Sequence, residues 1–343
     1  MGKVAIELEK GLYLPGEDVK GVARIYLDKP VSERSAGIYL TGKERTEVSY
    51  ETSSYSGGHS HQQRQTAVED REFVHQEFPL PLPLGEKGKV QPGDYKIPFR
   101  FALPQQLPPT YRGKHARIWY AITAKIDVPL GIDIGETLEL PVISTGQRDF
   151  RSSPTNISST TWGSSESPGV TFVLERGEYR RGEVISGKCN FRNPGGKTLR
   201  KIDVCLAYVE YAVARGHAER AEVMKLESAV PIEGKVSEGG SQFSIQIPQQ
   251  SPLTYESSLS NLKCSLRVGL DIAWGSDVAA SEDIRVVGDV GAEKEVPYRY
   301  VDQEKRLEET HPKKPGANQF CPYCGAAIKF PNSEFCSNCG ASL

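Results

Sequence analysis

The sequence predicts an all-β fold in which two tandem β-sandwiches precede a small cysteine-rich module. Three observations support this prediction: short runs of alternating apolar and polar residues, an internal repeat, and two Cys-x-x-Cys pairs close together. The chain has 33 glycines and 23 prolines, which punctuate these runs, and no long stretch has helical periodicity. Strands at such spacing are typical of two packed antiparallel sheets.

The internal repeat covers most of the chain. Residues 4–21 can be laid over residues 170–187 at an offset of 166, and residues 103–111 match residues 247–255 at an offset of 144. The first copy therefore carries about 22 extra residues between the two matched segments. Coinciding positions include Leu8/Leu174, Gly11/Gly177, Tyr13/Tyr179, Gly16/Gly182 and Glu17/Glu183.

Residues 1–148 form the first predicted sandwich. Val4, Ile6 and Leu8 alternate with polar or small neighbours, which is the pattern of a half-buried strand. A turn around Gly16 then leads into the next strand. Strands are expected at residues 19–27, 35–42, 93–102 and 117–128.

The extra length of the first copy falls in residues 49–72. This segment is rich in Ser, Gly, Gln, Arg and Glu, and it predicts an exposed loop because it can bury little apolar area. The second copy lacks it, so we expect partner selectivity to lie there. His59 and His61 could bind a metal, although a His-x-His in a polar loop is more often solvated.

The second predicted sandwich spans residues 170–290, with strands expected at residues 185–191, 201–207, 241–247 and 262–272. Residues 149–169 predict a linker, because residues 151–169 contain ten Ser or Thr. Residues 291–318 are charged and contain proline, which favours an extended tether to the last module.

The last module, residues 319–343, predicts one structural Zn²⁺ ion. Two Cys-x-x-Cys pairs, with eleven residues between them, supply the four soft ligands that tetrahedral zinc prefers. The segment has few large apolar side chains, so metal binding would provide most of its stability. The alternatives are two disulfides or a chance occurrence of the pattern. The segment resembles the short prokaryotic zinc ribbons, which implies an archaeal or bacterial source. The predicted ligands are Cys321, Cys324, Cys336 and Cys339.

The two sandwiches resemble the arrestin fold superfamily, and the α-arrestins in particular. The resembling segments are residues 11–21, 93–104, 107–111 and 118–127, which occur in the order typical of that family. The resemblance implies tandem arrestin-like N-terminal and C-terminal domains. It also implies a non-catalytic adaptor that holds protein partners, such as cargo or membrane-protein tails, through sheet faces, edges and loops.

Two features bear on what the resemblance transfers. Receptor-type arrestins carry adjacent lysines in the first strand, whereas here Lys10 stands beside Glu9, so phosphoreceptor sensing is not transferred. Residues 108–111 spell a Pro-Pro-x-Tyr ligand for WW domains. The alternative, which we prefer, is that this segment leads into a strand, as the matching residues of the second copy indicate.

The sequence contains no constellation typical of an enzyme. A phosphate-binding Gly-x-x-x-x-Gly-Lys loop, a Gly-x-Ser-x-Gly elbow and a His-Glu-x-x-His pair are all missing. Glu17 and Glu183 recur between the copies, and we interpret them as completing matched turns. The protein is therefore not expected to be an enzyme.

Composition favours a cytoplasmic protein that binds other proteins. Cys189, Cys205 and Cys264 are predicted to be buried thiols, in keeping with a reducing compartment. No signal peptide or membrane span is predicted, so membrane contact would be indirect or peripheral. The alternative is a nucleic-acid-associated zinc-ribbon protein. The near balance of 42 basic and 44 acidic residues, and a ribbon with Lys329 as its one basic residue, argue against it.

Overall fold

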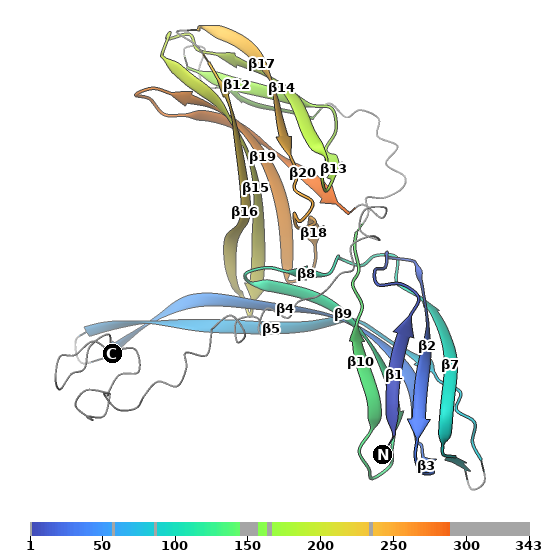
Figure 1. Ribbon diagram of the computed structural model, residues 1–343. Helices are drawn as coiled ribbons and strands as arrows, with labels where there is room; N and C mark the ends of the chain where they lie inside the picture. The colour runs from blue at the N-terminus through green and yellow to red at the C-terminus, as the bar shows by residue number, and fades with distance from the viewer. Residues whose placement is uncertain are drawn as a thin grey trace, which may run out of the picture. The chain divides into compact units, whose positions relative to one another are not determined.

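The computed structural model describes residues 2–56, 59–85, 88–144, 157–162, 167–232 and 236–288. The chain divides into two compact units, Met1–Pro297 and Tyr298–Leu343, and every described residue lies in the first. The described residues form strands arranged mainly in antiparallel sheets, which confirms the all-β prediction (Figure 1). They include no helix with the length and hydropathy of a membrane span.

The first copy of the repeat contains two main sheets. A three-stranded sheet has the order β1-β2-β7, and a larger sheet has the order β10-β9-β4-β5, with β8 pairing β9. Two short strands, β3 and β6, form a separate pair. The bounds are β1 Lys3–Leu8, β2 Asp18–Leu27, β3 Val31–Ser32, β4 Ser35–Ser56, β5 His59–Pro79, β6 Lys89–Val90, β7 Gly93–Ala102, β8 Tyr111–Arg112, β9 Ala116–Asp127 and β10 Ile134–Glu139.

The second copy contains two corresponding sheets. One has the order β11-β12-β14-β17, and the other has the order β13-β20-β19-β15-β16, with β18 pairing β19. The bounds are β11 Ile157–Trp162, β12 Gly169–Leu174, β13 Glu178–Arg180, β14 Val184–Arg192, β15 Leu199–Ala214, β16 His217–Pro231, β17 Glu238–Gln246, β18 Tyr255–Glu256, β19 Ser260–Ile272 and β20 Val278–Val287.

The sequence repeat extends to the strand register. Lys3 pairs with Tyr26 in the first copy, and Gly169 pairs with Arg192 in the second, both at the offset of 166. β4 and β15 keep this offset, and even a bulge recurs: the register shifts after Gly42 in β4 and after Tyr208 in β15. From β7/β17 onward the offset is 144.

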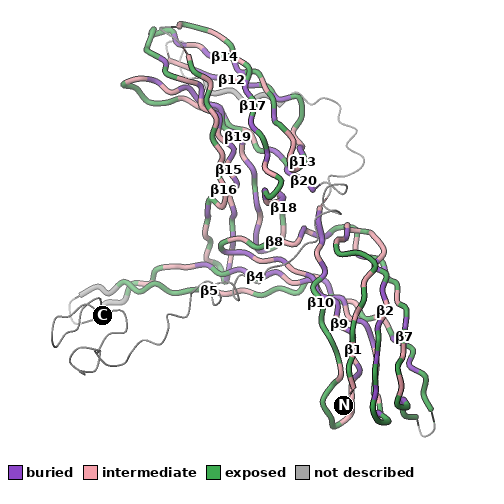
Figure 2. Tube along the Cα trace, in the orientation of Figure 1, coloured by how far each residue is buried: buried purple, intermediate pink, exposed green. Residues whose placement is uncertain are grey.

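Alternating burial builds each core, as Figure 2 shows along the strands. In β2 every second residue from Val19 to Leu27 is buried, and β15 and β19 alternate similarly. Tyr13 pairs in parallel with Val142, and Tyr179 pairs in parallel with Val286. Both tyrosines are buried, and the two pairs are related by the offsets of 166 and 144. The packing of these apolar residues is the main source of stability in each copy.

The prediction of a loop at residues 49–72 is wrong. The segment continues β4 and β5 as a long antiparallel hairpin, which pairs from Gly37↔Pro79 to Ser56↔His59. Val48 and Ala67 in this hairpin are buried. Polar side chains do not prevent a two-stranded ribbon, because its hydrogen bonds come from the backbone.

The hairpin also accounts for most of the extra length of the first copy. Thr46 pairs with Glu69, and its counterpart Ala212 pairs with Glu219, so the offset falls from 166 to 150 across the hairpin tip. Sixteen of the extra residues therefore extend this hairpin beyond its counterpart in the second copy. The other six fall between β5 and β7.

A strand occurs inside the predicted linker. Ile157–Trp162 form β11, which pairs antiparallel with β12 from Ile157↔Leu174 to Trp162↔Gly169. Four of the six residues of this strand are Ser or Thr, so it lacks the alternation of apolar and polar residues that predicts a strand. The predicted tether, residues 291–318, and the predicted zinc ribbon, residues 319–343, lie outside the described residues.

Candidate functional site

Glu44, on β4, is a fully buried carboxylate that joins the two copies. Its Oε2 accepts hydrogen bonds from Ser257 Oγ at 2.8 Å, from Ser258 Oγ at 3.1 Å and from the backbone N–H of Leu259 at 3.2 Å. Its Oε1 accepts one from Ser260 Oγ at 2.6 Å. These donors lie around the turn between β18 and β19. The carboxylate can stay buried because neutral donors satisfy both of its oxygens.

Glu210, on β15, makes the reciprocal connection. It is also fully buried, and its carboxylate accepts hydrogen bonds from Tyr111 Oη at 2.7 Å and from the backbone N–H of His115 at 2.6 Å. Burial, the adjacent Glu210 charge and this hydrogen bond raise the pKa of Tyr111 above its usual range. The phenol therefore stays protonated and remains a donor.

The two connections are related by the internal repeat. Glu44 and Glu210 differ by 166, and the backbone donors His115 and Leu259 differ by 144. Two further backbone bonds, Glu47 N–H to His115 O and Val213 N–H to Leu259 O, obey the same offsets. We call this pseudo-symmetric contact, centred on Glu44 and Glu210, the polar joint.

A second matched pair extends the polar joint. The Ser49 N–H donates to Glu219 Oε2 at 2.9 Å, and the Arg215 N–H donates to Glu69 Oε2 at 2.6 Å. Ser49 and Arg215 differ by 166, whereas Glu69 and Glu219 differ by 150, as the hairpin offset requires. Each hairpin thus bonds the other copy through equivalent atoms.

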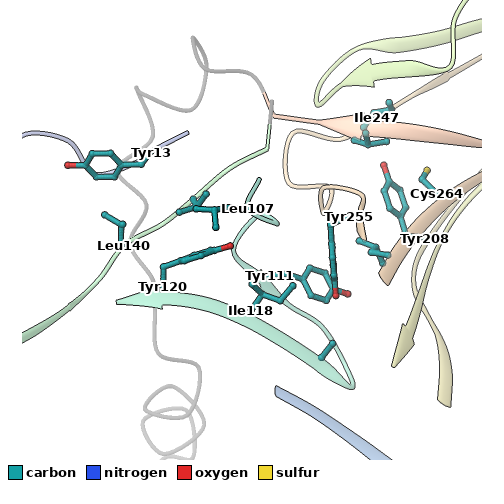
Figure 3. Packing of buried hydrophobic residues seen from close by; sticks show 14 of the residues in the cluster. Tyr13, Leu107, Tyr111, Ile118, Tyr120, Leu140, Tyr208, Ile247, Tyr255 and Cys264 are labelled. Atoms are coloured by element: carbon teal, nitrogen blue, oxygen red, sulfur yellow. The ribbon is translucent and has the colours of Figure 1, made fainter. Parts of the chain in front are cut away.

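Aromatic rings lie between the matched bonds. The rings of Tyr111 and Tyr255, which are repeat equivalents, lie 4.8 Å apart between centroids at an interplanar angle of 52° (Figure 3). Tyr50 stacks on His217 with a centroid distance of 3.7 Å. Tyr111 and Tyr255 are buried, as are Glu44 and Glu210, and hydrogen bonds are stronger in such an environment than in water.

The polar joint is not fully symmetric. Gly113 lies against Glu210, where an added Cβ would stand 1.6 Å from Oε2, whereas the matching residue, Ser257, donates to Glu44. His115 Nδ1 lies 3.3 Å from Glu219 Oε2, but its counterpart is Leu259. The two halves are therefore chemically distinct, and each copy is fitted to the other.

The sheet edges also differ between the copies. In the second copy β11 covers the outer edge of β12, whereas no described strand pairs with the outer edge of β1, the equivalent strand. The Ile6 N–H points to that edge and donates to Glu136 Oε2 at 2.8 Å. By the alternation of antiparallel pairing, the Val4 and Leu8 N–H groups point the same way.

Several predicted residues are now placed. Tyr111 of the Pro-Pro-x-Tyr segment is buried in the polar joint, so it is not available to a WW domain. Glu17 and Glu183 complete matched turns, as predicted, by accepting from the N–H of Leu14 at 3.1 Å and of Arg180 at 2.8 Å. Gly16 and Gly182 allow these turns through φ angles of +76° and +80°.

The predicted zinc ligands, Cys321, Cys324, Cys336 and Cys339, lie outside the described residues, as do the side chains of His59 and His61. Among the residues that the structure describes, no group of three or more His, Cys, Asp or Glu side chains could hold a metal ion. Cys189 and Cys264 are free and buried, as predicted, whereas Cys205 is half-buried. Burial raises the pKa of the Cys264 thiol to about 12.

Sequence reasoning missed Glu44 and Glu210, although a signal was available. The offset of 166, found on residues 4–21, also carries Glu44 onto Glu210. Identical charged residues at equivalent positions, just beyond the strands predicted at residues 35–42 and 201–207, indicate a shared role. Nothing in one sequence shows that the partner donors come from the other copy.

Comparisons with known proteins agree with the first sandwich. Residues 2–148 match the family model "Arrestin (or S-antigen), N-terminal domain". The chain is 29% identical over 136 residues to arrestin domain-containing protein 1 of Rattus norvegicus, covering 38% of this chain and 27% of that protein. It is 27% identical over 147 residues to human arrestin domain-containing protein 4, covering 42% and 35%.

A longer match is to arrestin domain-containing protein 17 of Caenorhabditis elegans, at 25% identity over 193 residues, which covers 56% of this chain and 43% of that protein. The chain thus spans about a quarter to less than half of these relatives' length. Arrestin-domain proteins are non-catalytic adaptors, which supports the prediction that this protein is not an enzyme. The first sandwich is therefore similar to an arrestin N-terminal domain, and the chain is similar over part of its length to the arrestin domain-containing proteins.

Proposed function

We propose that the protein is a cytoplasmic, non-catalytic adaptor that binds an extended segment of a protein partner along the edge of β1 that lies beside β10 and is paired with no described strand. The observation that carries this proposal is the difference between the two copies at one sheet edge. β11 covers the edge of β12, whereas the equivalent edge of β1 is paired with no described strand. Backbone groups on such an edge accept an added strand by ordinary ladder hydrogen bonds.

The Glu136 side chain supports this reading of the edge. Its carboxylate accepts from the Ile6 N–H, where the carbonyl of an added strand would accept. The repeat equivalent of Glu136 is Ala280, which cannot accept such a bond, and there the N–H groups of β12 face β11. A side chain that can move aside keeps the edge satisfied until a partner arrives.

The proposed zinc ribbon, formed by Cys321, Cys324, Cys336 and Cys339 around one structural Zn²⁺, would add a separate docking module of prokaryotic type. Its composition, with one basic residue, favours a protein partner over nucleic acid. Cargo or the tail of a membrane protein is the class of partner that an arrestin-like adaptor would bind in the cytoplasm.

A peptide-display selection against the full chain tests the edge proposal. Selected peptides should slow the amide exchange of Val4 and Leu8, and the Val4→Pro variant should lose binding. Proline removes the outward N–H but no bond to β2, so an edge strand can hold it. Val170→Pro, at the repeat-equivalent position of the covered strand β12, should leave binding intact if the variant folds. Peptides that bind the Val4→Pro variant as well as the wild type would refute the assignment.

A further inference from the structure

A second surface lies on the outer face of the β1-β2-β7 sheet. Lys20 on β2 stands directly opposite Arg100 on β7, and Arg24 stands directly opposite Lys96. All four side chains are exposed on the same face. Like charges at directly opposed positions destabilise a sheet, so folding gives no reason for these two pairs.

The second copy shows that the fold does not need these charges. At the same register of β14 and β17, Ser186 stands opposite Ser244, and Asn190 stands opposite Gly240. Both pairs are neutral, although the backbone pairing is equivalent. The basic pairs are thus a property of the first sandwich alone.

Acidic neighbours neutralise part of the face but not all of it. Arg24 pairs with Glu7 at 2.8 Å, and Arg100 pairs with Asp18. Among the described residues, no acidic side chain lies within ion-pair distance of Lys20 or Lys96. The exposed face has five basic residues, Lys3, Lys20, Arg24, Lys96 and Arg100, against Glu7, Asp18 and Asp94 on the strands and Glu9 just after β1, opposite Lys20. It is therefore positive on a chain of net charge −2.

The shape of the face decides between anionic partners. The two basic pairs are four residues apart along β2, about 13 Å, and they project from a sheet rather than from an edge. Tyr26 is 53% exposed on this face, opposite Lys3. An exposed tyrosine beside lysines is suited to the interface of a bilayer, where its ring and hydroxyl meet apolar and polar layers.

We propose that this face binds peripherally to an anionic lipid bilayer, with Lys20 and Lys96 as the main contacts to lipid headgroups. A bilayer presents many negative charges in one plane, which matches a broad sheet face, whereas a peptide strand matches the edge of β1. The two surfaces are separate, so lipid binding does not depend on strand addition. Binding at this face would hold the adaptor at the membrane where a partner's tail emerges.

Co-sedimentation of the full chain with lipid vesicles tests the proposal. The wild type should bind vesicles of phosphatidylcholine with phosphatidylserine, bind phosphatidylcholine alone weakly, and lose binding as salt rises. The Lys20→Ser/Lys96→Gln variant should bind about thirtyfold less, the factor expected for two lysines at such a surface. The control, Lys188→Ser/Lys263→Gln, changes the net charge equally at exposed lysines elsewhere and should bind like the wild type.

Thermal unfolding of the same variants provides the second measurement. Lys20→Ser/Lys96→Gln should unfold at the same temperature as the wild type or higher, because two like-charge pairs are removed. The proposal would be overturned if the wild type bound vesicles equally with and without phosphatidylserine. An equal loss of vesicle binding in both double variants would also overturn it. So would a wild type that binds polyglutamate through Lys20 and Lys96 in preference to vesicles, which would assign the face to an acidic peptide.

Discussion

Glu44 and Glu210 are repeat equivalents, and each is buried against donors from the opposite copy of the fold. The backbone N–H of Leu259 bonds the first carboxylate, and the backbone N–H of His115 bonds the second. Neither carboxylate has an ion-pair partner among the described residues. Hydroxyl and amide donors therefore stabilise both carboxylates. These donors come from the opposite copy, so they reach the carboxylates only when the two copies are packed together.

The first prediction concerns this polar joint. Glu44→Ala leaves three serine hydroxyls and one N–H without an acceptor, so the free energy of unfolding should fall by about 3 kcal/mol. Glu47→Ala is the matched control on the same strand. Its side chain is 53% exposed, so that variant should change little. Denaturant unfolding measures the free energy of unfolding of both variants. Equal losses would show that the buried hydrogen bonds of Glu44 add no stability.

Gly113→Ala should weaken the other half of the joint. A Cβ at this position would collide with Glu210 Oε2, so Tyr111 and the carboxylate must move apart. We expect a loss of stability of about 2 kcal/mol, since a buried hydrogen bond is broken. Gly195→Ala is the control, because nothing lies within 4 Å of its added Cβ and its φ is not positive. The same denaturant titration distinguishes the two.

The extended hairpin should be removable without unfolding the protein. Replacing residues 49–66 with Asn-Gly would copy the turn at Arg215 and Gly216, which have φ angles of +49° and +82°. The new Asn keeps an N–H where Ser49 donates to Glu219, although the stacking of Tyr50 on His217 is lost. We expect a small loss of thermal stability and, if selectivity lies in the hairpin, weaker partner binding. Unchanged binding would show that the hairpin is not part of the surface that binds the partner.

Thiol labelling should separate the cysteines by burial. The pKa of Cys264 is raised by burial to about 12, so almost no thiolate exists at pH 8, and burial likewise raises the pKa of Cys189. Cys205 is half-buried and should label faster than either. Peptide-level mass spectrometry after iodoacetamide treatment measures each rate, and denaturant should equalise the three. Faster labelling at Cys264 than at Cys205 would contradict the packing of β19.

Metal content tests the proposed zinc ribbon. The full chain should carry one zinc ion, and Cys321→Ser/Cys324→Ser should lose it. Cys205→Ser is the control and should retain the metal. Native mass spectrometry gives the stoichiometry. Iron in place of zinc, or two disulfides with no metal, would refute the structural-zinc proposal.

Much of the fold was predictable because its strands show a local alternation of apolar and polar residues. The strand at residues 4–8 has an apolar side chain at every second position, and the repeat gave its counterpart at β12. The turns at Gly16 and Gly182 were also predictable, since glycine and glutamate recur at one offset. Each of these features depends on residues that are close together in the sequence.

Two elements could not be predicted in this way. The distal hairpin of β4 and β5 and the strand β11 contain few apolar residues, so they lack the pattern that indicates a strand. Backbone pairing to a neighbour forms them instead. The polar joint was missed for a related reason, because its donors lie more than 90 residues from their acceptors.

The strand β11 has a consequence for stoichiometry. A pair of equivalent sandwiches with both edges open would offer two receptive strands, so one chain could cross-link two partner segments. Because β11 pairs with β12, β1 is the one strand of this equivalent pair whose outer edge is paired with no described strand. Strand addition at this position would then be monovalent, and any larger assembly would have to grow through other surfaces.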